Sequence, residues 1–213
     1  MIPYATVITH IFSLFPISVC FYIYKYNFEQ EALFLFFNLI FATLFSTFYH
    51  TYDYDSIKLN VSSYSQWAFL DHFAAATLII VTALYTLRFR SSELYLLAYI
   101  FKGVVICCYM LVDPIFNYWI YVIISFLFIY KFKIVLESFK KQCILCFISI
   151  TTASLAIFSY YTALTYYNYY KLFHSLWHCF IFTTSGLLCI LKYKMNKYFI
   201  RETDYNRTRV DSV

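Results

Sequence analysis

Two pairs of residues have the types and spacing for metal chemistry, although each pair lies in a strongly apolar stretch. Ser46 precedes His50 by four residues, and His174 precedes His178 by four. Side chains four residues apart lie on one face of a helix, one turn apart. Two imidazoles in this arrangement form a bidentate site for a metal ion such as zinc.

A third imidazole, from His50, would give zinc three nitrogen ligands and leave a fourth position for water, the pattern of a catalytic zinc site. Zinc lowers the pKa of such a water to about 7. Asp71 is expected to orient or deprotonate this water, and Ser46 to hydrogen-bond the water or a substrate oxygen. A single histidine is more simply explained as an interfacial side chain bonded to a neighbouring helix. The convergence of several such groups is what favours a metal site.

Two further histidines are left outside the predicted site. His72 points about 100° away from Asp71 on the same helix, and His10 has no partner at helical spacing. Both are expected to form local hydrogen bonds.

The composition predicts a membrane protein. Of the 213 residues, 62% are hydrophobic and only 13% charged, whereas soluble domains are about a quarter charged. A soluble globular fold is therefore excluded. With only 2 Gly and 3 Pro, collagen-like and flexible low-complexity chains are excluded as well. The net charge of +5 is interpreted as a signal of membrane orientation, and nucleic acid is not an expected partner.

Apolar runs separated by short polar breaks predict an all-α bundle of seven transmembrane helices, although six are also arguable. The expected spans are residues 4–24, 32–50, 67–87, 94–112, 115–130, 142–163 and 172–191. A spanning helix takes about 20 residues, so seven use roughly 140 positions and leave no room for a separate extramembrane domain. Residues 192–213 are expected to form a basic cytosolic tail.

The distribution of Lys and Arg orients this bundle. With seven spans, 13 of these residues fall on the side of the C-terminus and two, Lys58 and Lys171, on the other. The positive-inside rule then predicts an outside or luminal N-terminus and a cytosolic C-terminus. The sequon Asn60-Val61-Ser62 falls in a predicted outer loop. This orientation brings the five predicted site residues to the outer or luminal leaflet: Ser46, His50, Asp71, His174 and His178.

The order Ser-x-x-x-His, Asp and His-x-x-x-His on the second, third and seventh helices resembles the CREST superfamily, which includes alkaline ceramidases and progestin and adiponectin receptors. Residues 45–50 (FSTFYH) followed by Asp53, and residues 174–179 (HSLWHC), look most like the transmembrane protein 8 family. Tyr52 stands where that family often carries Cys, and the large extracellular region of its longer members is not expected here. The chain is similar to the short, fusion-related form.

The resemblance implies zinc at His50, His174 and His178, with Asp71 and Ser46 beside the water. The leading expectation is a zinc-dependent lipid hydrolase, ceramidase- or phospholipase-like, that cleaves an amide or ester bond in a plasma or secretory-pathway membrane. The alternative is a non-enzymatic membrane-remodelling, cell-fusion or receptor protein whose metal site is structural. A membrane lipid is the expected substrate or ligand. A transporter or channel is less supported, because no Gly- and Pro-broken helix pair is visible.

Overall fold

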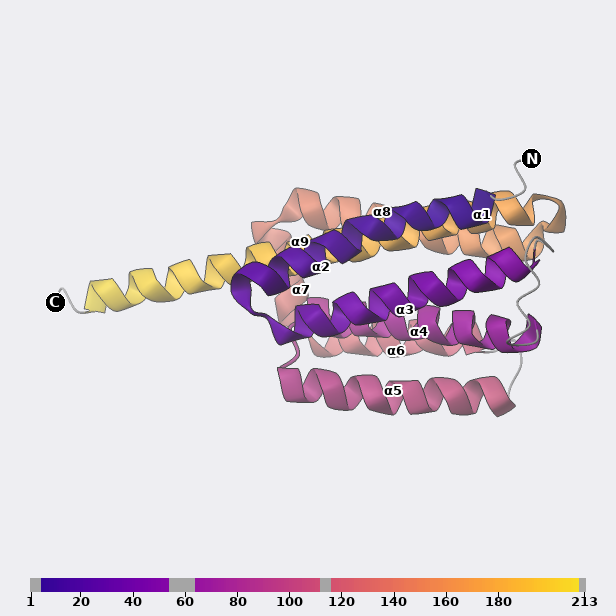
Figure 1. Cartoon of the computed structure of the whole chain (residues 1–213). Coiled ribbons are helices and arrows are strands. Elements are labelled where there is room, and N and C mark those ends of the chain that lie inside the picture. The colour runs from indigo at the N-terminus through magenta and orange to yellow at the C-terminus, as the bar shows by residue number, and fades with distance from the viewer. Residues whose placement is uncertain (1–4, 54–63, 112–115, 211–213) are drawn as a thin grey trace.

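A bundle of helices forms the protein, in agreement with the predicted all-α class (Figure 1). The computed structural model describes residues 5–53, 64–111 and 116–210, and these residues contain no strand. The sequon at Asn60 lies outside the described residues. The described elements, in chain order, are α1 Ala5–Ile8, η1 Thr9–Ser13, α2 Leu14–Asn27, α3 Gln30–Asp53, α4 Tyr64–Thr86, α5 Ser91–Leu111, α6 Phe116–Tyr130, α7 Phe132–Lys141, α8 Cys143–Thr165, η2 Tyr167–Tyr169 and α9 Tyr170–Val210.

Five helices of the described part are long and apolar enough to cross a membrane. They are Thr6–Asn27, Gln30–Thr51, Gln66–Thr86, Cys143–Thr165 and Tyr170–Tyr198. The fourth and fifth predicted spans fall on α5 and α6, which are helical but not among these five. The 15 residues of α6 extend about 22 Å, less than the roughly 30 Å of a hydrocarbon core.

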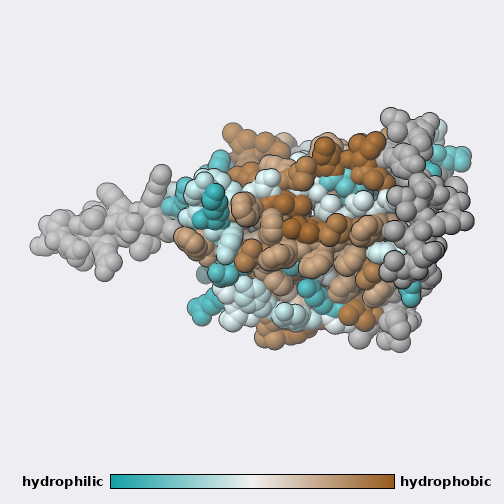
Figure 2. Space-filling view, in the orientation of Figure 1, coloured by the Kyte–Doolittle hydropathy of each residue, from teal (hydrophilic) through white to brown (hydrophobic). Residues whose placement is uncertain are grey.

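The outer surface of the bundle is apolar. Figure 2 shows hydrophobic residues over the middle of the bundle and hydrophilic ones gathered towards its ends. Phe126, Ile129 and Ile144 are each about 70% exposed or more. A helix in a soluble protein turns such side chains towards the core, so the surroundings of this bundle are lipid. The described part of the chain is therefore that of a membrane protein.

Helical structure also extends beyond the predicted spans. The segment α7 falls in a stretch interpreted as a connection between spans, and it carries exposed Phe132, Leu136 and Phe139 beside a basic C-terminal end at Lys140 and Lys141. This pattern is typical of a helix lying in the membrane interface. The last helix, α9, continues through the expected end of its span at residue 191 and projects beyond the bundle (Figure 1).

A buried ion pair joins the helices at the end of the bundle from which α9 projects. Lys192 of α9 contacts Glu29, which lies between α2 and α3, and the two side chains are 7% and 15% exposed. The ammonium group also lies 3.6 Å from the centroid of the Tyr85 ring on α4. Nearby, the thiols of Cys20 and Cys189 are 3.6 Å apart. Together these contacts connect α2, α4 and α9.

Removing one charge of this pair should destabilise the bundle. Glu29→Gln leaves the Lys192 ammonium buried without a counterion, which we expect to lower the free energy of unfolding by about 3 kcal/mol. The double variant Glu29→Gln/Lys192→Met removes both charges and should recover at least half of that loss. Thermal unfolding of the purified protein in detergent measures both. Equal melting temperatures for wild type and Glu29→Gln would contradict a stabilising role.

Candidate metal centre

The structure brings together the three histidines of the predicted metal site. His50 lies near the end of α3, and His174 and His178 lie one turn apart near the start of α9. Because α3 runs towards the end of the bundle where α9 begins (Figure 1), the three side chains meet there. Their ring centroids are 4.8 to 5.1 Å apart, and all three side chains are buried.

The nitrogen atoms of this cluster are arranged as metal ligands. Nε2 of His50 lies 3.1 Å from Nε2 of His174 and 3.1 Å from Nε2 of His178. A neutral imidazole nitrogen carries either one hydrogen or one lone pair, so two linear hydrogen bonds at this atom are not possible. Tetrahedral zinc with nitrogen ligands at 2.0–2.1 Å separates those nitrogens by roughly 3.3 Å. The spacing at Nε2 of His50 is therefore close to that of nitrogens that share one ion.

A fourth histidine, which the sequence interpretation left out, joins the cluster. His10 lies in η1, and its side chain is 5% exposed. One ring nitrogen each of His10, His50 and His178 lie within 4.8 Å of one another. The ring centroids of His10 and His178 are 4.4 Å apart. The expected local hydrogen bond is present, to the carbonyl of Val7, but His10 also lies in the cluster, to which the sequence interpretation did not assign it. The sequence carried one signal for this role: His10 is an ionisable residue within the predicted span 4–24.

Contacts between the first and last helices hold His10 in place. The hydroxyl of Ser175 donates to the carbonyl of Lys171 at 2.6 Å, and it lies 3.1 Å from the hydroxyl of Thr6. Since Ser175 uses its hydrogen on Lys171, Thr6 is the donor between the two hydroxyls. Thr6 precedes His10 by one helical turn, and Ser175 follows His174 directly. This hydrogen bond therefore aligns the two histidine-bearing helices.

A small, mostly apolar cavity with three polar side chains on its wall lies beside the histidines. Ser46 of α3, Asp71 of α4 and His178 are among its lining residues, and its volume is about 20 Å³. Such a volume holds about one water molecule. The Ser46 hydroxyl is buried and makes no hydrogen bond of acceptable geometry in the described part of the chain, although Asp71 is near enough to interact with it. A water in the cavity would give the Ser46 hydroxyl a partner.

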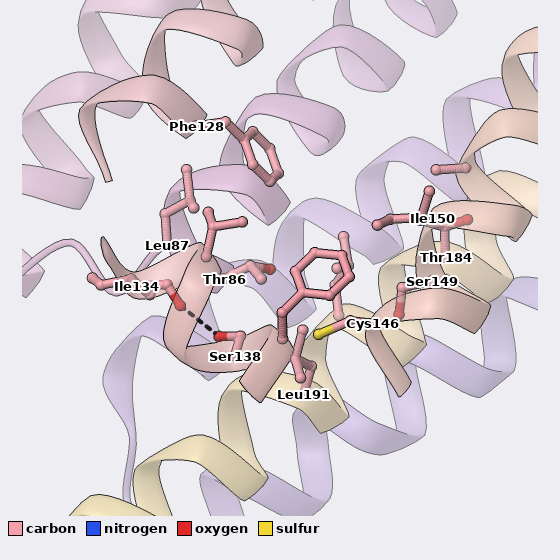
Figure 3. A pocket seen from close by; sticks show the side chains of 14 residues that line it. Thr86, Leu87, Phe128, Ile134, Ser138, Cys146, Ser149, Ile150, Thr184 and Leu191 are labelled. Atoms are coloured by element: carbon pink, nitrogen blue, oxygen red, sulfur yellow. Dashed lines mark hydrogen bonds between the residues drawn. The ribbon is translucent and has the colours of Figure 1, made fainter. Parts of the chain in front are cut away.

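A larger cavity lies towards the other end of the bundle, against α7, and has a different character (Figure 3). It measures about 130 Å³, and its described lining residues include no histidine and no carboxylate. Its Ser138 hydroxyl donates to the carbonyl of Ile134 at 2.8 Å, as Figure 3 shows. Thr184 on its wall lies about 9 Å along α9 from His178. Cys146 is the one described lining residue that could bind a metal, and a single ligand does not make a metal site, so the candidate site is the histidine cluster.

Comparison with known families places the chain in one of them. The profile of a family described as protein of unknown function (DUF3522) matches residues 4–179, a range that contains all four clustered histidines, Ser46 and Asp71. The chain belongs to this family. No curated protein matches it. The family description assigns no activity, so a function has to be argued from the site.

Metal binding at the cluster should stabilise the protein. We expect zinc added to chelator-treated protein to raise the free energy of unfolding by about 2.7 kcal/mol when free zinc exceeds the dissociation constant 100-fold. His174→Ala should remove this effect. His72→Ala changes an exposed histidine outside the cluster and should keep it. Thermal unfolding with and without zinc provides the measurement. A wild-type melting temperature that does not change on addition of zinc would contradict metal binding at the cluster.

Proposed function

We propose that this DUF3522 protein is a seven-span zinc-dependent lipid hydrolase that cleaves an amide or ester bond in the outer or luminal leaflet. The observation that carries the proposal is the cavity for one water, lined by Ser46, Asp71 and His178. It combines a carboxylate, a hydroxyl and an imidazole of the histidine cluster at one buried point. Lys and Arg are in excess in the connections on the side of the C-terminus, and this excess supports an outer or luminal position for the cluster.

The residues present fit a zinc ion. His50, His174 and His178 supply three imidazole nitrogens, which suit zinc, and the 3.1 Å spacing around Nε2 of His50 is consistent with shared coordination. Bound zinc supplies a Lewis acid that polarises a carbonyl and lowers the pKa of water to about 7.

The chain's own side chains have distinct tasks around the cavity. Asp71, buried on α4, accepts the proton of the attacking water as a general base. Ser46 donates its hydroxyl hydrogen to the substrate carbonyl oxygen as negative charge develops there. Ala42, Leu78 and Phe182 also line the cavity, and their apolar side chains exclude bulk water from the reaction.

A membrane lipid is the substrate that suits this location. The cluster lies towards one end of membrane-spanning helices, at the depth where the linkage between a lipid's headgroup and its acyl chains is found. The resemblance to the CREST superfamily, and within it to the transmembrane protein 8 family, supports a lipid amide or ester. It also favours a plasma membrane or secretory-pathway location.

One observation favours a second function. The approach of His10 adds a fourth imidazole to the cluster, and zinc sites closed by four protein ligands are typically structural. In this alternative the protein is a non-enzymatic membrane-remodelling, cell-fusion or receptor protein, and the metal holds its helices together.

The two functions differ in the effect of Asp71→Asn. In the hydrolase, this variant should keep its zinc and lose turnover by about 10²- to 10⁴-fold, because the general base is gone. Mass spectrometry of a lipid panel incubated with purified protein measures turnover, and metal analysis measures zinc. His72→Ala should behave as wild type. Zinc-loaded wild type that turns over no lipid on the panel would favour the structural alternative.

A further inference from the structure

We propose that His10 is the fourth protein ligand of the metal centre and occupies the coordination position that a three-histidine site leaves to water. The inference rests on the metal site proposed above and is independent of whether the protein turns over a substrate. It assigns a role to the first helix, on which no residue of the predicted site lies.

The hydrogen bonding of His10 leaves one nitrogen available. Its Nδ1 lies 3.2 Å from the carbonyl oxygen of Val7, and a carbonyl can only accept, so Nδ1 carries the hydrogen. In the neutral ring Nε2 then has a free lone pair. Nε2 is buried and has no hydrogen-bond partner among the residues that the structure describes. A histidine whose Nδ1–H donates to a backbone carbonyl while Nε2 awaits a partner has the arrangement of a metal ligand with its supporting contact.

His10 has the other imidazoles as neighbours. His10, His50 and His178 each place one ring nitrogen within 4.8 Å of the others, and His174 places Nε2 3.1 Å from that of His50. Two hydrogen-bonded residues next to the cluster, Thr6 and Ser175, keep the first helix against α9. His50 therefore links His174 to this set of three, and coordination by all four requires the nitrogen of His174 to move closer to those of His10 and His178.

The local backbone around His10 makes this coordination adjustable. Residues Thr9–Ser13 form a 3₁₀ segment within an otherwise α-helical span, and such segments often mark a hinge. With four imidazoles bound, water reaches the metal only when His10 withdraws or the ion accepts a fifth ligand. His10 thus controls whether the centre is closed or open.

X-ray absorption of the zinc-loaded full-length protein tests the assignment. Wild type should show four nitrogen neighbours of imidazole type at 2.0–2.1 Å and no sulfur. His10→Cys should add one sulfur neighbour at about 2.3 Å, since a thiolate would replace the imidazole. Leu96→Cys, a control at an exposed position near the start of α5, should show no sulfur. His10→Ala should bind zinc at least tenfold more weakly, because even changes to supporting residues cost 10- to 100-fold.

The outcomes separate this proposal from the proposed function. Three imidazoles plus an oxygen in wild type, with no sulfur in His10→Cys, would overturn the role of His10 and leave the three-histidine site intact. Wild type that binds no zinc would overturn both. If His10→Ala does not fold, the sulfur signal of His10→Cys decides alone: its presence supports coordination by residue 10, and its absence refutes it.

Discussion

The burial of four imidazoles among apolar helices is the constraint that organises the rest of the protein. Ionisable groups are costly inside a membrane unless they are paired, ligated or hydrated. Here His10, His50, His174 and His178 come from three separate spans and meet at one point. The helices that carry them are consequently fixed in register, orientation and rotation about their axes. Hydrophobic packing alone does not impose such precision, because lipid chains are as apolar as the helix surfaces.

The buried ion pair is a second polar contact between helices, in addition to the histidine cluster, and we call the two the polar junctions of the bundle. Lys192 lies 18 residues after His174 on α9, about 27 Å along the helix, and it is paired with Glu29 and packed on Tyr85. One continuous helix therefore takes part in a histidine cluster at one end of the bundle and an ion pair at the other. The apolar residues between these junctions fill space, and the two polar junctions define how the helices align.

Much of this architecture follows from the sequence, because long apolar runs and the i, i+4 rule are local signals. The pairs Ser46 with His50 and His174 with His178 were visible for that reason. His10 was not, since it stands alone on its helix and its partners lie more than 35 residues away. The amphipathic α7 was missed because ten residues with several lysines resemble a polar connection. Lys192 was interpreted as a tail cation, yet its stem and charge are buried against Glu29 and Tyr85.

The contacts between the first and last spans carry a consequence for how the protein is made. Thr6 meets Ser175 and Cys20 meets Cys189, each across 169 residues of chain. A ribosome delivers the first span to the membrane long before α9 exists, so His10 and Thr6 lack these partners throughout most of synthesis. The bundle can close only after α9 has been inserted.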